Sequence, residues 1–158
     1  MKEYEVKDIP LEELVKTGGK RLEPLIKAIY NYGFLKIVCI EPGDYHSEHP
    51  QNYKDKVDAV ITIPYTIEVE QMEDEIGNRV EQNNLKADIG FYQSHYKIIG
   101  EKDKKGNLLS IIIEPDKKLR SHDKMEQACD KGILLVADVL EKYLDKHRGL
   151  IREELKTA

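Results

Sequence analysis

An alternation of apolar and polar residues runs from Asp58 to Glu70, and it constrains the fold more than any other part of the sequence. Every second residue from Ala59 to Val69 is apolar, and most of the residues between them are polar. Such a period of two predicts a strand with one buried face and one face toward water. Pro64 has no amide hydrogen for a ladder bond, so it favours a sheet edge or a bulge at that point. We therefore expect one long strand here, around which the rest of the chain is organised.

Helical periodicity appears at both ends of the chain. Near the N-terminus it predicts two short helical stretches, which Gly18 and Gly19 separate and Gly33 ends. Near the C-terminus Ser121 is a plausible N-cap for the longest helix, which we expect Gly149 to interrupt. Both helical regions carry apolar residues at spacings of three and four, so we expect them to pack against a sheet.

Three further segments have the composition of strands. Leu35–Glu41 is apolar nearly throughout, which predicts a short central strand that is buried on both faces or nearly so. Residues 86–100 and Leu108–Glu114 are expected to pair as a hairpin, with Gly106 and Asn107 in its tight turn.

Two interpretations remain open for residues 71–84. The segment can form a hairpin closed at Gly77–Asn78, which would place Ile67 opposite Ile89 on the same face of the sheet. It can equally form a short helix with three apolar residues along one side, Met72, Ile76 and Val80. We prefer the hairpin.

The predicted order is two helices, four strands and a final helix. This order indicates an α+β domain that spans residues 1–158, with a mostly antiparallel sheet of about four strands and helices packed on one face. A chain of this length buries roughly 70% of the surface that its unfolded form exposes, so it can build its own core.

Composition excludes some partners and favours a compartment. Charged residues make up 35% of the chain, but the two signs are interspersed and the net charge is −5. This disfavours general nucleic-acid binding and leaves room for a local basic patch.

Cys39 and Cys129 lie far apart and outside any CxxC, so we expect buried free thiols. No apolar run approaches the roughly 18 residues of a membrane span, and we expect a soluble cytoplasmic protein without a membrane partner.

The loop predicted for residues 42–56 carries the most specific chemical signal. Asp44, His46, Glu48 and His49 place two carboxylates and two imidazoles within six residues, directly after a predicted strand. These groups suit zinc or another divalent metal. The alternatives are a solvated polar loop and an exposed pH switch.

The spacing of these residues is similar to the HxHxDH motif of the metallo-β-lactamase superfamily, with Asp44 in place of the first His and Glu48 in place of the Asp. The similarity covers six residues. A metal-dependent hydrolase built on this loop would use Asp44, His46 and His49 as ligands and Glu48 as general base toward a metal-bound water. A ligand from outside the loop, such as His95, would also be expected.

Aromatic and acidic residues supply a different hypothesis, a surface for protein recognition. The chain has nine tyrosines and no tryptophan, and tyrosine combines a rigid apolar body with a polar tip. An acidic cluster at the predicted hairpin tip would suit a basic partner. The candidate partner-binding residues are Tyr65, Tyr92, Tyr96, Glu73, Asp74 and Glu75. There are two simpler alternatives. The tyrosines can merely fill half-exposed strand positions, and the acidic cluster can merely be solvated.

These observations favour a non-enzymatic interaction or assembly protein that presents a long β-hairpin and a sheet surface to a protein partner or to a second copy of itself. This hypothesis needs no catalytic residue and no cofactor. The metal-dependent hydrolase is the second hypothesis, and a ligand-binding domain that uses the tyrosines is the third.

Overall fold

The computed structural model describes residues 3–4, 9–32, 35–61, 69–98 and 105–157. The helices are α1 (Leu11–Tyr32), α2 (Val69–Gln82) and α3 (His122–Thr157). The strands are β1 (Glu3–Tyr4), β2 (Leu35–Glu41), β3 (Asp55–Ile61), β4 (Ala87–Ile98) and β5 (Lys105–Pro115), and a single 3-10 turn, η1, covers Pro50–Asn52.

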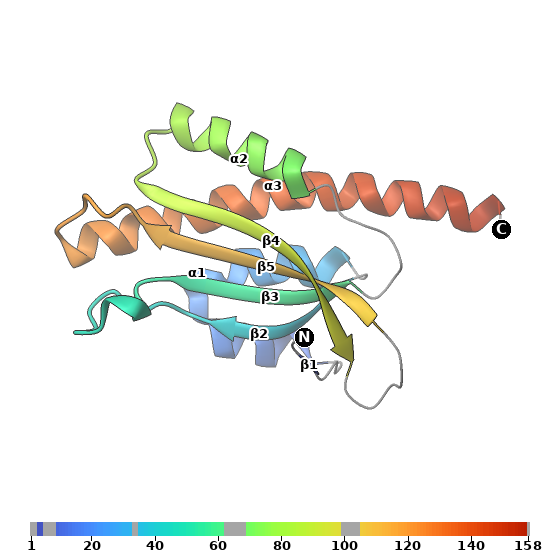
Figure 1. Cartoon of the computed structure of the whole chain (residues 1–158), viewed down its shortest axis with the longest axis horizontal. Helices are drawn as coiled ribbons and strands as arrows, with labels where there is room; N and C mark the ends of the chain where they lie inside the picture. Colours follow the sequence, from blue (N-terminus) through green and yellow to red (C-terminus); the bar gives the residue numbers. More distant parts are fainter. Residues whose placement is uncertain (1–2, 5–8, 33–34, 62–68, 99–104, 158) are drawn as a thin grey trace.

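The strands form one sheet in the order β1-β4-β5-β3-β2. The pairs β2–β3, β3–β5 and β4–β5 are antiparallel, and the short β1 adds a parallel pairing at Lys97 and Ile98 of β4. Figure 1 shows α1 and α3 running along one face of this sheet, with α2 beside α3 at its upper edge. The predicted α+β class, with a mostly antiparallel sheet and helices on one face, is confirmed.

The core lies between the sheet and the helices. β3 and β5 turn alternate residues toward the helices, as the period of two requires. α1 and α3 place residues at spacings of three and four against them. Its fully buried apolar residues include Leu22, Leu25, Ile26 and Ile29 of α1, Val57 and Ala59 of β3, Leu109, Ile111 and Ile113 of β5, and Ile133, Val136, Val139 and Leu140 of α3.

The break predicted in the first helix is present at Gly19, whose φ of 74° and ψ of 179° are not helical. A positive φ of this size suits glycine and strains other residues. Gly18, next to it, is buried, and a Cβ there would lie 2.5 Å from Cδ1 of Ile26. Gly19 therefore allows the chain to change direction, and Gly18 allows the first helical stretch to pack closely against the second.

The prediction of a long strand from Asp58 to Glu70 with a hairpin after it is wrong. β3 ends at Ile61, residues 62–68 lie outside the described part of the chain, and Val69–Gln82 is helix α2. Met72 and Ile76 are buried on one side of that helix, which packs against α3 and β4. Packing of this apolar side, which is a tertiary effect, decides between the two interpretations that the local sequence leaves open.

Other predicted details also change. Leu35–Glu41 forms β2 as expected, but the prediction that it is central and buried on both faces is wrong. The strand lies at an edge of the sheet, where α1 covers one of its faces and most of its residues are only half-buried. Ile89 of β4 lies opposite Ile113 of β5, while Ile67, its predicted neighbour, lies outside the described residues. Gly106 and Asn107 lie within β5, paired with β4, and not in its turn.

The C-terminal helix is longer than predicted. α3 continues through Gly149 and spans 36 residues, which corresponds to about 54 Å at a rise of 1.5 Å per residue. Figure 1 shows its C-terminal part extending beyond the sheet. No helix in the described ranges is both long and apolar enough to cross a membrane.

Candidate functional site

The loop between β2 and β3 is held to the body of the protein from its inner side. Tyr45 is buried, and its hydroxyl donates to Oδ2 of Asp55 at 2.9 Å. Oδ1 of Asp55 accepts from the Gly43 amide at 2.7 Å and from Nη2 of Arg21 at 2.8 Å. Arg21 also donates to the Gly43 carbonyl and lies 4.9 Å from the centre of the Tyr45 ring. One buried carboxylate therefore joins α1, the loop and β3.

Burial favours the protonated forms of the Tyr45 hydroxyl and the Cys129 thiol. It raises the pKa of the Tyr45 hydroxyl well above its ordinary range, and the Asp55 charge adds to the effect. Burial also raises the pKa of the Cys129 thiol to about 12, although a hydrogen bond with Tyr45 lowers it in part. Both groups stay protonated at neutral pH, so the network fixes the loop and offers no ready nucleophile.

The predicted metal ligands lie on the outer side of the same loop. Asp44 accepts from the His46 amide at 3.1 Å, while the His46 ring lies 3.0 Å from Oε2 of Glu126 on α3. Glu48 and His49 are exposed. Within the described residues, which include this whole loop, no three His, Cys, Asp or Glu side chains are placed to hold a metal ion. The structure therefore does not bring Asp44, His46 and His49 together, because the loop folds around Tyr45.

Of the predicted partner-binding tyrosines, Tyr92 is the one whose side chain lies within the described part of the chain. Tyr92 is 59% exposed on the sheet face that points away from the helices. Its ring lies over Gly90, where a Cβ would be 2.9 Å from the Tyr92 ring. Tyr65 lies outside the described residues. Tyr96 belongs to β4, and its side chain is likewise outside the description.

The predicted acidic residues lie on α2 and not at a hairpin tip. Glu75 is occupied within the chain, since Nζ of Lys142 lies 2.5 Å from its Oε1. Glu73 accepts from the Phe91 amide at 3.3 Å. Asp74 is exposed. The structure therefore leaves Asp74 available to a partner and gives Glu75 an internal role.

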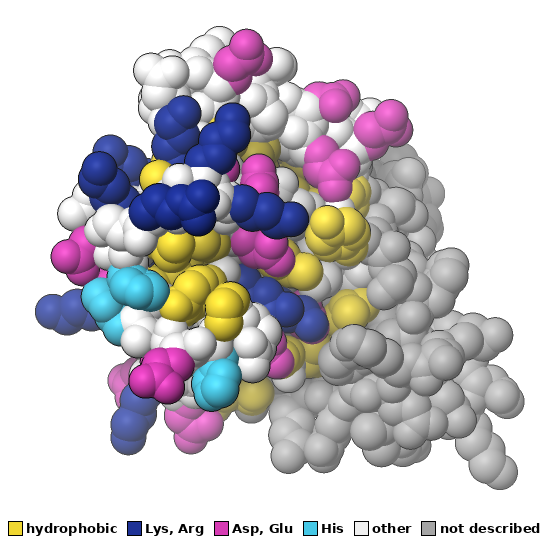
Figure 2. All heavy atoms as spheres, turned by 60° about the vertical axis from the view of Figure 1, so that its left-hand side comes forward, with side chains coloured by type: hydrophobic (Ala, Val, Ile, Leu, Met, Phe, Trp, Pro, Cys, Tyr) yellow, Lys and Arg dark blue, Asp and Glu magenta, His cyan; other side chains and the backbone are white. Residues whose placement is uncertain are grey.

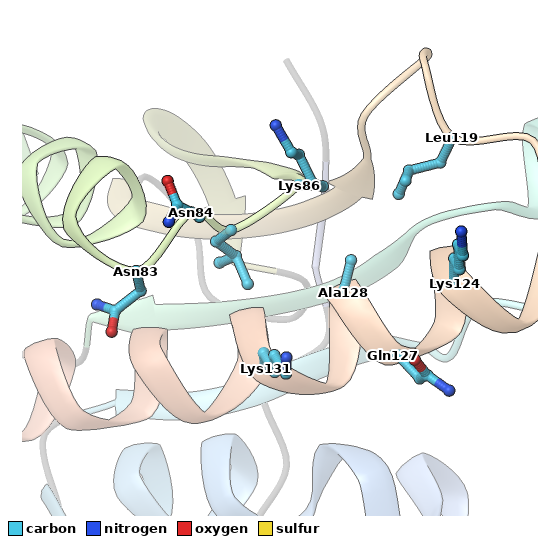
Figure 3. A pocket seen from close by; sticks show the side chains of 9 residues that line it. Asn83, Asn84, Lys86, Leu119, Lys124, Gln127, Ala128 and Lys131 are labelled. Atoms are coloured by element: carbon cyan, nitrogen blue, oxygen red, sulfur yellow. The ribbon is translucent and has the colours of Figure 1, made fainter.

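A groove that the sequence did not predict lies between α3 and the connector from α2 to β4. It consists of two adjoining hollows of about 180 and 450 Å³, which share Asn83, Leu85 and Lys131. We refer to the first hollow as the basic groove, and its lining residues are Lys86, Lys124, Lys131, Asn83, Asn84, Gln127, Leu85, Leu119 and Ala128. Figure 3 shows Lys86 on the connector, with Lys124, Ala128 and Lys131 on the facing helix. The second hollow continues along α3 past Leu134, which is 59% exposed.

The end of α2 fixes the shape of the basic groove. Asn84 has a φ of 50°, the left-handed conformation in which helices commonly end. Its amide donates to the Glu81 carbonyl at 3.3 Å, and the Leu85 amide donates to the Val80 carbonyl at 3.0 Å. These two bonds are those of a Schellman motif, and they turn the chain toward β4. The Lys86 carbonyl then accepts from the Asp116 amide at 2.8 Å, which holds the connector beside the end of β5.

The charge of the basic groove is not neutralised within the described part of the chain. No carboxylate there lies within ion-pair distance of Lys86, Lys124 or Lys131. In the second hollow, by contrast, Arg79 pairs with Asp138. Figure 2 shows Lys and Arg side chains gathered in a band on this face, with hydrophobic side chains directly beneath them. The groove therefore offers positive charge, amide groups and an apolar floor in one place.

One signal for the groove was present in the sequence. Lys124, Gln127 and Lys131 stand at spacings of three and four, so they share one face of the C-terminal helix. The contribution of Asn84 and Lys86 depends on the end of helix α2, which the hairpin predicted for residues 71–84 does not contain.

Comparison of the chain with protein-family models, with curated proteins and with solved structures gave no match.

Proposed function

We propose that this protein is a non-enzymatic interaction or assembly protein, and that its basic groove binds an acidic segment of a protein partner. The observation that carries the proposal is that Lys86, Lys124 and Lys131 line one hollow without a neutralising carboxylate in the described residues. Positive charge that is left unpaired at a concave surface attracts a complementary negative partner and fixes its orientation.

The rest of the lining suits a polypeptide. Leu85, Leu119 and Ala128 give the groove an apolar floor for side chains of a partner. Asn84 and Gln127 carry amides that can both donate to and accept from a peptide backbone. The hollow also continues along α3 toward the exposed Leu134, so an elongated segment has room to extend.

The hairpin and sheet provide a second surface for the same role. β4 has 12 residues and β5 has 11, while a strand usually has five or six. Lys86 directly precedes β4, and Tyr92 is exposed on the outer face of the same strand. A partner that occupies the groove therefore lies at the base of the long hairpin, whereas Tyr92 offers a separate contact on the opposite face of the sheet.

Peptide binding tests this proposal. A fluorescently labelled peptide of alternating glutamate and leucine should bind the protein, with an affinity that falls as salt rises. The triple variant Lys86→Glu, Lys124→Glu and Lys131→Glu should weaken binding roughly a hundredfold, since close charge pairs each contribute on the order of a kcal/mol or more.

A matched control separates the groove from the overall charge. Lys16→Glu, Lys20→Glu and Lys27→Glu change the net charge by the same amount on α1, where none of the three lines the groove. This control should bind nearly as well as the unmodified protein. Equal losses in both triple variants, or no binding by the unmodified protein, would contradict the proposal.

A further inference from the structure

We infer that the acidic segment which occupies the basic groove is the outer face of α2 from a second copy of this chain, so that two copies form a two-fold symmetric dimer. The inference rests on the proposed function, because it names the partner of the groove. It draws on the charge distribution of α2 and on a glycine that packing within one copy does not explain.

The outer face of α2 carries a line of carboxylates. Glu70, Asp74 and Glu81 are separated by four and seven residues, so they follow one another along the side of the helix opposite Met72 and Ile76. All three acidic side chains are exposed, and none pairs with a base among the described residues. The line extends about 16 Å, and Lys124 and Lys131 stand about 10 Å apart along α3, at 1.5 Å per residue. The three carboxylates therefore equal the three ammonium groups of the basic groove in number, and their line is long enough to span the two lysines of α3.

Gly77 supplies the second observation. It lies in the interior of α2, on the same outer face, where glycine costs up to about 1 kcal/mol relative to alanine. No atom in the described ranges lies within 4 Å of the position that its Cβ would take. Packing within a single copy thus gives no reason for a glycine there. Close approach of another chain to the outer face of α2 would explain the glycine, because a side chain there would keep the two chains apart.

The positions of the two surfaces favour a closed dimer. The connector that begins at Asn83 follows α2 directly, so the acidic face and the basic groove adjoin each other on the molecule. Figure 2 shows acidic side chains gathered near the top, at the level of α2, beside the band of basic ones. When two copies are related by a two-fold axis that passes between these two surfaces, each α2 lies against the basic groove of the other copy. The resulting interface is self-complementary.

A charge-swap experiment tests the dimer. Sedimentation velocity of the unmodified protein should show a mass that rises from one copy to two with concentration. The groove variant (Lys86→Glu, Lys124→Glu and Lys131→Glu) and a helix variant (Glu70→Lys, Asp74→Lys and Glu81→Lys) should each remain monomeric, because like charges then face each other. An equimolar mixture of the two variants should recover the dimer, since both contacts of the mixed pair join opposite charges.

A single exposed substitution provides a measurement that does not depend on charge. Gly77→Gln adds a good helix former, so it should raise the stability of the monomer, while its side chain should raise the dimer dissociation constant roughly tenfold or more. An unchanged dissociation constant in Gly77→Gln, or a mixture of charge-swapped variants that stays monomeric, overturns the dimer.

The outcomes distinguish this inference from the proposal on which it rests. A protein that is monomeric at every concentration but binds the acidic peptide in its basic groove overturns the dimer and leaves the proposed function standing. A protein that neither dimerises nor binds the peptide overturns both. The control variant on α1 should dimerise like the unmodified protein, and its failure to do so would mean that overall charge, and not this interface, controls association.

Discussion

The side chain of Arg21 donates to Oδ1 of Asp55 at 2.8 Å, which joins the first helix to a strand that begins 34 residues later. Asp55 is 1% exposed, so this carboxylate is almost fully removed from water. A buried charge is tolerated when it is paired and hydrogen-bonded, and Asp55 accepts bonds from three groups, Arg21, Gly43 and Tyr45. The pair therefore fixes the β2–β3 loop against the core.

Replacing Asp55 by alanine should lower the free energy of unfolding by about 3 kcal/mol or more, because it leaves the Arg21 charge and the Tyr45 hydroxyl without their partner. Urea denaturation at neutral pH measures this change. Glu48→Ala, on the exposed side of the same loop, is the control and should change stability by no more than about 0.5 kcal/mol. A loss for Asp55→Ala as small as that of the control would show that the network contributes little.

Asp130 should make the protein less stable as pH rises. Burial raises the pKa of its carboxyl above the ordinary value of 3.8, and the nearby Arg21 guanidinium offsets part of the effect. A carboxyl with a higher pKa in the folded than in the unfolded chain binds more protons when folded, so stability falls as pH rises from 3.8 through the folded pKa. The neutral Asp130→Asn variant lacks this loss. Its stability relative to the unmodified protein should increase with pH over that interval and then level off.

Urea denaturation of both proteins at a series of pH values measures the difference for Asp130. A stability difference that does not change with pH, or that decreases as pH rises, would contradict the expected sign.

The two cysteines should react with thiol reagents at different rates. Both are free, but Cys129 is fully buried and has a pKa of about 12 because of that burial. Cys39 is half-buried on the edge strand β2, and burial and the charge of Glu41 raise its pKa to a smaller extent. Since the thiolate is the reactive form, the folded protein should show one slowly reacting thiol, and the second should appear on unfolding.

Labelling with a chromogenic disulfide reagent, with and without denaturant, counts these thiols. Cys39→Ser should remove the reaction of the folded protein, whereas Cys129→Ser should leave it in place. Two thiols that react together in the folded state would contradict the burial of Cys129.

Asn84 should be replaceable by glycine but not by alanine. Its φ of 50° suits glycine and disfavours residues with a Cβ that lack the local hydrogen bonding of asparagine. Asn84→Ala should therefore cost about 1 kcal/mol of stability, while Asn84→Gly should be neutral or stabilising. Thermal denaturation measures both, and Gln82→Ala at the end of α2 is the control. Equal effects of the two substitutions at Asn84 would mean that the backbone conformation there is not held.

Local sequence patterns predicted much of the secondary structure. The apolar repeat after Ser121 identified α3, and the Ser121 hydroxyl accepts from the Lys124 amide at 3.4 Å at its start. Gly19 breaks the first helix as predicted. These predictions succeeded because periodicity and backbone preference act over a few residues.

The local pattern gave a wrong prediction for residues 71–84, where both a hairpin and a helix were compatible with it. Met72, Ile76 and Val80 fit one side of a helix, yet the preceding alternation favoured an extended chain up to Glu70. The apolar side of α2 packs against α3 and β4, which follow it in the sequence. The contacts with α3 join segments that are distant along the chain, and no short window of the sequence contains both.

The sequence by itself determined the α+β class, the break at Gly19 and the apolar faces of the helices, because these depend on residue type and spacing. The tertiary structure decided which charged groups meet. It left Asp44, His46 and His49, which are neighbours in the sequence, without the arrangement of a metal site, and it brought Lys86 to the same hollow as Lys124 and Lys131. Side chains converge on a site through the packing of distant elements, and that packing is set by the whole core and not by the residues of the site.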